Sequence, residues 1–172
     1  MMYFSSILIA VVIFVSPHVG GKAITDSGCP PSFERRDEEC FMLMDLRANW
    51  PNAKLYCQVI GGDLARITNA DLQTTIADLV SKKPGGRYWV DGSDMLQSRV
   101  WRWMINDGKS VPFTYTNWRH GEPSSVYENC VEVRSEWKGM WNDLDCIQML
   151  GFICQARATN GVEMKINEET DR

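Results

Sequence analysis

The sequence is poor in the residues from which many metal and catalytic centres are built. Only two of its 172 residues are histidines, and no two of its six cysteines lie as close as Cys-x-x-Cys. Structural zinc sites draw on closely spaced Cys and His ligands, and nucleophilic triads need a base beside the nucleophile. The composition therefore argues against a zinc-centred fold and against hydrolases that depend on a histidine base.

The chain also lacks a long apolar run. The run from Ile7 to Val15 is much shorter than the roughly 20 apolar residues that a membrane-spanning helix needs. It lies within the first 21 residues, which carry no Lys, Arg, Asp or Glu and end in the Pro17–Gly21 break. This pattern favours a secretory signal peptide over residues 1–21, cleaved after Gly21 or Ala23, rather than a membrane anchor. We expect a secreted, extracellular protein without a membrane span.

An excess of positive charge is absent as well. The net charge is -4, and an acidic chain has little electrostatic attraction for phosphate backbones, so nucleic acid is not an expected partner. No Asn-x-Ser/Thr acceptor for N-glycosylation occurs. We expect a short leader over residues 22–28, one domain over residues 29–155, and a polar, disordered tail over residues 156–172.

All six cysteines follow the predicted signal peptide. An even number of cysteines in a secreted chain indicates disulfides. Their positions do not by themselves decide which cysteine pairs with which, so several pairings stay open at this point.

Hydrophobic periodicity predicts two helices followed by short strands. The first helix begins near Asn49 with Pro51 in its first turn and ends at Gly61-Gly62. The second is capped by Thr68 or Asn69 and ends before Pro84-Gly85-Gly86. Strands are expected around residues 40–44, 88–90, 100–105, 130–133 and 151–154, whereas residues 34–39 read as a charged turn and residues 109–127 show little regular pattern. This order is typical of an α+β fold.

The stretch from Glu122 to Cys146 is rich in side-chain oxygen. Five of its residues form the candidate ligand set, with three carboxylates, one carboxamide and one hydroxyl: Glu122, Glu128, Asp143, Asn142 and Ser124. Calcium prefers oxygen ligands of these kinds. The residues therefore suggest a Ca2+ site in this stretch.

Several segments, taken in order, resemble one known family. They are Trp50-x-x-Ala53-x-x-x-Cys57 followed by Gly61-Gly62-Asp63-Leu64-Ala65, then Tyr88–Gly92, then Asn117-Trp118-x-x-Gly121-Glu122-Pro123, and Trp141-Asn142-Asp143. From Cys29 to about Gln155 the chain resembles the C-type lectin-like domain, in its long form with an extra N-terminal hairpin. Asp91 departs from the family's Trp-Ile-Gly-Leu strand motif. The resemblance implies two helices, short antiparallel sheets, a long loop region and three disulfides.

The resemblance also implies specific covalent features. Its cysteine pairs would be Cys29 with Cys40, Cys57 with Cys154, and Cys130 with Cys146. It further suggests a cis peptide bond before Pro123. Only about 5–6% of X-Pro bonds in folded proteins are cis, so this expectation rests on the resemblance.

By the same resemblance, one set of residues would hold both calcium and sugar: Glu122, Ser124, Glu128, Asn142 and Asp143. Glu122 leans the preference toward mannose-type sugars, whose motif in the family is Glu-Pro-Asn, but Ser124 departs from that motif and from Gln-Pro-Asp. An auxiliary calcium site could use Asp94, although Ser98 and Ser125 stand where acidic ligands would be wanted. Trp137 could stack on a sugar, although partial burial is the simpler expectation.

The expected function is therefore a secreted calcium-dependent lectin that binds microbial or cell-surface glycans, as immune lectins of invertebrate type do. Agglutination by such a lectin would need a homo-oligomer. Two alternatives stay open: a lectin-like domain that binds a protein partner without sugar, and a glycosidase that uses carboxylates such as Glu128 and Asp143.

Overall fold

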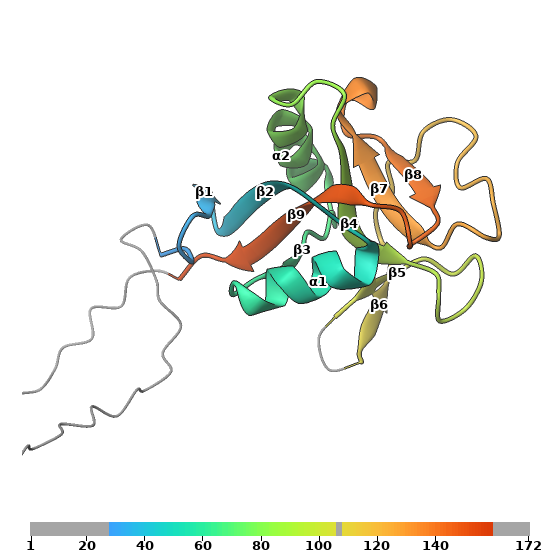
Figure 1. Ribbon diagram of the computed structural model, residues 1–172, viewed down its shortest axis with the longest axis horizontal. Helices are drawn as coiled ribbons and strands as arrows, with labels where there is room; N and C mark the ends of the chain where they lie inside the picture. The colour runs from blue at the N-terminus through green and yellow to red at the C-terminus, as the bar shows by residue number, and fades with distance from the viewer. Residues whose placement is uncertain (1–27, 106–107, 160–172) are drawn as a thin grey trace, which may run out of the picture.

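The computed structural model describes residues 28–105 and 108–159 of the chain (Figure 1). The predicted signal peptide, the leader up to residue 27 and the tail from residue 160 lie outside these residues. Within the described ranges, no helix is long and apolar enough to cross a membrane.

Both predicted helices are present. Helix α1 (Trp50–Val59) is capped by Asn49, whose side chain accepts a hydrogen bond from the backbone N–H of Asn52. Helix α2 (Ala70–Ser81) is capped by Asn69 in the same way, through the N–H of Leu72. Of the two predicted caps of α2, the structure selects Asn69 rather than Thr68. A side-chain acceptor at this position satisfies an N–H group that the first helical turn leaves unpaired.

The strands form one connected sheet. Its main path runs β1-β2-β9-β4-β5-β6, with β3 beside β9, β7 beside β4 and β8 beside β7. All pairs are antiparallel except β4 with β9, which run parallel. The strand bounds are β1 Glu34–Arg36, β2 Glu39–Ala48, β3 Asp63–Leu64, β4 Arg87–Ser93, β5 Arg102–Met104, β6 Ser110–Pro112, β7 Cys130–Arg134, β8 Trp141–Leu144 and β9 Leu150–Arg157. A 3-10 helix covers Ser135–Trp137.

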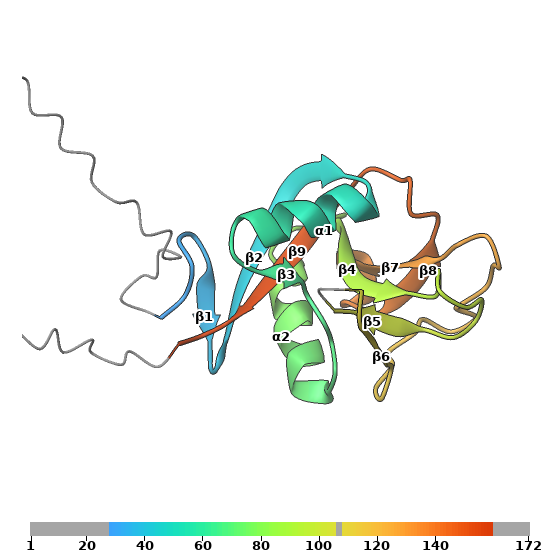
Figure 2. The same cartoon turned by 90° about the horizontal axis from the view of Figure 1, so that it is seen from below.

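The side chains on the two faces of β9 pack into two different hydrophobic clusters. Phe152 and Cys154 belong to the cluster that contains α1 residues Trp50 and Cys57, whereas Ile153 belongs to the cluster that contains α2 residues. Successive strand residues point to opposite faces, so this alternation places the helices on opposite sides of β9. Figure 2 shows α1 crossing β2 and β9, with β1 toward one end of the domain and β7 and β8 toward the other.

Three disulfides join these parts, and they are the pairs that the resemblance implied: Cys29–Cys40, Cys57–Cys154 and Cys130–Cys146. The second ties α1 to β9. The third ties the start of β7 to the loop after β8. The stretch with the predicted ligands is therefore closed by a covalent bond as well as by strand pairing.

Several short strands differ from the sequence-based expectations. Residues 34–36, predicted as a charged turn, form β1 against β2. Residues 110–112, predicted as irregular, form β6 against β5. Asn142 and Asp143 lie in β8, where no strand was predicted. These strands carry few apolar residues, so partner strands rather than an alternating pattern define them.

The end of the domain also lies later than expected. Strand β9 continues to Arg157, two residues beyond the predicted boundary at Gln155. The N–H of Ala158 then donates to the carbonyl of Glu38, and that of Thr159 to the carbonyl of Gly28. Backbone pairing therefore holds residues 156–159, which composition alone had assigned to the tail.

Candidate functional site

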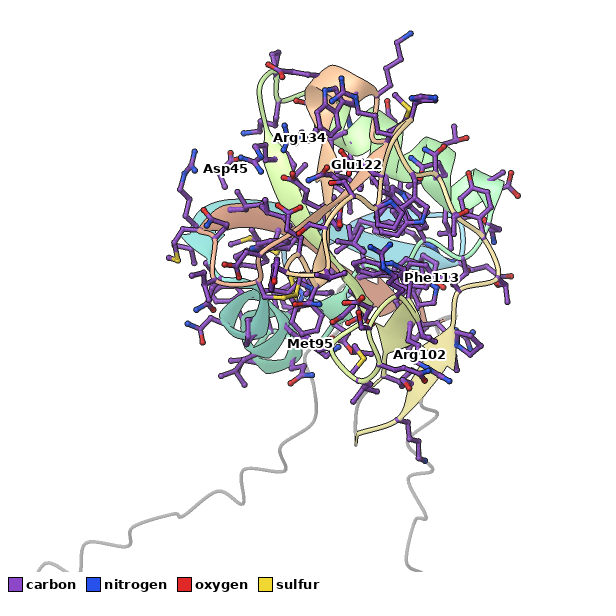
Figure 3. All side chains as sticks on the ribbon, turned by 90° about the vertical axis from the view of Figure 1, so that its right-hand side faces the viewer. Asp45, Met95, Arg102, Phe113, Glu122 and Arg134 are labelled. Carbon is purple, nitrogen blue, oxygen red and sulfur yellow. A yellow bond between two sulfur atoms is a disulfide. The ribbon has the colours of Figure 1, made fainter. Side chains whose placement is uncertain are left out.

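The five predicted ligands come from two segments that the fold brings together. Glu122, Ser124 and Glu128 lie in the long connection between β6 and β7, and Asn142 and Asp143 lie in β8. Strand β8 pairs with β7 so that Asp143 faces Val131 and Asn142 faces Glu132. Figure 3 shows Glu122 on the face of the molecule that carries these connections.

Asp143 holds the connection against the sheet. Its carboxylate accepts hydrogen bonds from the backbone N–H of Ser124, at 3.1 Å and 3.0 Å to its two oxygens, and from that of Ser125 at 3.0 Å. Asp143 is fully buried. The Glu122–Pro123 peptide bond is cis, as the resemblance suggested. A residue of β8 thus anchors the segment that contains Glu122 and Ser124.

The carboxylates of the site influence one another. Burial, and then the charges of Asp143 and Glu122, raise the pKa of the Glu128 carboxyl. One oxygen of Glu122, Oε2, is buried without a hydrogen-bond partner. An unpartnered buried carboxylate oxygen and mutual repulsion are both unfavourable in the absence of a counter-charge. Both features fit a hard cation bound by oxygen ligands.

The carboxylates are nevertheless not drawn together into one compact cluster. Across residues 28–105 and 108–159, no group of three or more His, Cys, Asp or Glu side chains has the spacing of a metal site. The set predicted here mixes carboxylates with a carboxamide and a hydroxyl.

Asn142 is held by its amide nitrogen. Its Nδ2 donates to Glu132 Oε1 at 3.0 Å and also to the backbone carbonyl of Asp143. Glu132 is fully buried and also accepts hydrogen bonds from Arg87 and Arg134. Glu132 was not among the predicted site residues, because in Val131-Glu132-Val133 the alternation suggests a solvent-facing side chain. The only signal in the sequence was an acidic residue between two apolar neighbours.

Two other predicted positions are engaged within the fold. The Asp94 carboxylate accepts from the N–H of Arg99 at 2.6 Å and from Asn129 Nδ2 at 2.8 Å. Trp137 is partly buried, and the guanidinium groups of Arg119 and Arg134 each lie 4.0 Å from its ring centre. These cation–π contacts already occupy the Trp137 ring, which leaves it poorly placed to stack on a sugar.

Comparison with known proteins places this chain in a family. A family model described as "Lectin C-type domain" matches residues 46–156. A perlucin-like protein of Mytilus galloprovincialis is 28% identical over 86% of this chain and 95% of its own length. The carbohydrate-recognition domain of the mouse scavenger receptor C-type lectin superimposes with a TM-score of 0.67, at 26% identity over 76% of this chain and 99% of that domain.

A type II antifreeze protein described as calcium-independent has the same fold. It superimposes with a TM-score of 0.66, at 27% identity over 76% of this chain and 95% of that protein. The family match covers both helices and all five predicted ligands. The chain belongs to the C-type lectin domain family.

Proposed function

We propose that this protein is a calcium-dependent carbohydrate-binding lectin, with Glu122, Ser124, Glu128, Asn142 and Asp143 as the ligands of one Ca2+ and of the sugar. The observation that carries the proposal is the buried, unpartnered Oε2 of Glu122, beside a Glu128 carboxyl whose pKa is raised by burial and by the charges of Asp143 and Glu122. A bound cation would relieve both conditions.

Bound calcium would offer coordination positions to two neighbouring hydroxyls of a sugar. The protein's own residues supply the rest of the recognition. Carboxylates such as Glu122 and Glu128 accept hydrogen bonds from sugar hydroxyls, and the carboxamide of Asn142 adds a neutral oxygen. Asp143 keeps the segment of Ser124 and Ser125 in place through their N–H groups. One set of side chains thereby serves metal and sugar together.

Ser124 shapes the expected preference. Its hydroxyl is shorter than a carboxamide and is a weaker calcium ligand, so we expect moderate calcium affinity. Glu122 matches the mannose-type motif, so we still expect the protein to prefer mannose-type sugars. We further propose that the protein is secreted and acts in innate immunity by recognising microbial or cell-surface glycans, as a homo-oligomer if it agglutinates cells.

A glycan array read with calcium, and again with chelator, tests the proposal. We expect binding to mannose-type glycans that the chelator abolishes. An Asp143→Ala variant should lose the signal, because the anchor of the Ser124 segment is removed, whereas Asp45→Ala, a change outside the site, should keep it. Binding of no glycan in either condition would reject the proposal.

A second candidate is a lectin-like domain that recognises a protein without sugar. Ser124 favours it, and a protein of the same fold is described as calcium-independent. Protein recognition would survive chelation, so calcium-dependent glycan binding decides against this candidate. The glycosidase alternative is not supported, because the chain belongs to a family of non-enzymatic domains.

A further inference from the structure

A buried charge network lies directly behind the proposed site. At its centre is Glu132, fully buried in β7. Its Oε2 accepts from Arg87 Nε at 2.8 Å, and its Oε1 accepts from Arg87 Nη2 at 2.9 Å and from Arg134 Nε at 2.8 Å. The same Oε1 accepts from Asn142 Nδ2 at 3.0 Å. One carboxylate therefore joins two arginines to a proposed ligand.

We propose that Glu132 is a positioning residue that decides which end of the Asn142 carboxamide faces the site. This inference rests on the proposed function of Asn142 as a calcium and sugar ligand. A carboxamide has nearly the same shape in either orientation, but only its nitrogen can donate to a carboxylate. Because Nδ2 is committed to Glu132 and to the carbonyl of Asp143, Oδ1 is the end left for a cation.

The two arginines restrict the side-chain orientation of Glu132 and, through it, that of the Asn142 carboxamide. Arg87 binds Glu132 through two nitrogens, which is the strong bidentate arrangement of guanidinium and carboxylate. Arg134 is held in turn by Trp137, whose ring centre lies 4.0 Å from its guanidinium carbon. Figure 3 shows Arg134 and Glu122 on the same face of the molecule. A buried carboxylate with this many donors has little freedom to turn away from Asn142.

The arginines also keep Glu132 from acting as another anionic ligand. Two guanidinium groups surround one carboxylate, so its charge is offset where it stands. Removal of one partner from a buried ion pair leaves an uncompensated charge. Glu132 therefore supports the site by hydrogen-bond direction rather than by attracting the cation itself.

The test compares two variants that each replace a fully buried carboxylate with an uncharged side chain. Glu132→Leu removes Oε1, which accepts from Arg87, Arg134 and Asn142 alike, so the Asn142 amide loses its acceptor. Asp91→Asn is the matched control, because Asp91 is equally buried but pairs with Lys54, which is not a ligand of the proposed site.

The first measurement uses metal-free protein. By NMR, the side-chain amide protons of Asn142 should exchange slowly with water in the wild type and in Asp91→Asn, and much faster in Glu132→Leu. The second measurement is calorimetric titration with calcium. The dissociation constant should rise roughly 10- to 100-fold in Glu132→Leu, as expected for loss of an outer-shell partner, and stay within about twofold in the control.

The outcomes separate this inference from the proposed function. Equal exchange of the Asn142 amide in all three proteins overturns the positioning role, whether or not calcium binds. Wild-type protein without calcium affinity rejects the proposed function, and with it the role of Asn142 as ligand. If Glu132→Leu does not fold, Glu132→Asp replaces it. That variant keeps the charge for the arginines but withdraws the acceptor from Asn142, and the same faster exchange is expected.

Discussion

At the scale of single residues, position 124 limits the sugar site most. The backbone N–H of Ser124 is bound to Asp143, so the segment is held in place while the side chain at this position remains exposed. The geometry of the segment therefore does not depend on the serine hydroxyl. A longer side chain with a carboxamide oxygen can be accommodated at the surface and can reach further.

Ser124→Asn should tighten calcium binding about tenfold, which corresponds to about 1.4 kcal/mol, and should strengthen binding to mannose. The reason is that a carboxamide oxygen is a better calcium ligand than a hydroxyl. Calorimetric titration with calcium, followed by titration with mannose, measures both effects. The same change at an exposed serine outside the site, Ser81→Asn at the end of α2, should give no such gain. A Ser124→Asn protein with unchanged affinities would mean that position 124 is not a ligand.

The residue scale also shows where sequence reasoning ends. The resemblance assigned Glu122, Asn142 and Asp143 to one site, and the structure brings their segments together. Glu132 was not predicted as a site residue, because Arg87 is distant from it in the sequence and Arg134, although close, belongs to no recognisable motif. Burial of a charged side chain becomes visible only when the strands that surround it are paired.

At the scale of elements, one lysine connects four parts of the fold. Lys54 of α1 donates to Asp63 of β3 and Asp91 of β4, each at 2.7 Å, and to the carbonyl of Met104 in β5. Asp91, which departs from the family's strand motif, is fully buried, and its Oδ2 has no hydrogen-bond partner. Burial outweighs the attraction of Lys54 and raises the pKa of Asp91 to about 8.

This pKa predicts how stability depends on pH. Between the ordinary pKa of an aspartate, about 4, and about 8, the folded protein retains a proton on Asp91 that the unfolded chain has released. Stability is then lost as pH rises through this window. Urea unfolding at several pH values should show this loss in the wild type relative to Asp91→Asn, which does not titrate. Parallel stability curves for the two proteins would contradict the raised pKa.

The elements themselves were predictable to different degrees. Both helices carry their own start signals, since Asn49 and Asn69 cap them through bonds to residues three positions later. Strand β8 carries no such local signal. Its residues Asn142 and Asp143 are polar yet nearly or fully buried, and pairing with β7 makes them a strand.

At the scale of the whole molecule, calcium binding and stability should be linked. The disulfide Cys130–Cys146 and the bonds of Asp143 hold the site stretch, but the unpartnered oxygen of Glu122 and the repulsion around Glu128 oppose it. A ligand that binds only the folded state stabilises it by about 2.7 kcal/mol at one hundred times its dissociation constant. Calcium bound at the site would thus raise the free energy of unfolding of the whole domain.

Differential scanning calorimetry should therefore show a melting temperature that rises by several degrees with saturating calcium and falls back with chelator. Asn142→Ala, which removes a proposed ligand, should abolish most of the rise. Magnesium at the same concentration should have a smaller effect, because it prefers stricter octahedral geometry. A melting temperature that does not respond to calcium would contradict the proposed site.

The sequence by itself determined the α+β class, the positions of both helices, the presence of disulfides and, through its resemblance, their pairing and the oxygen-rich stretch. These features depend on local signals or on residue spacing, which are visible in one dimension. The tertiary structure decided the short polar strands, the end of the domain, and the network behind Asn142. Each of these depends on contacts between distant segments, and a hydrogen bond across strands leaves little trace in the order of residues along the chain.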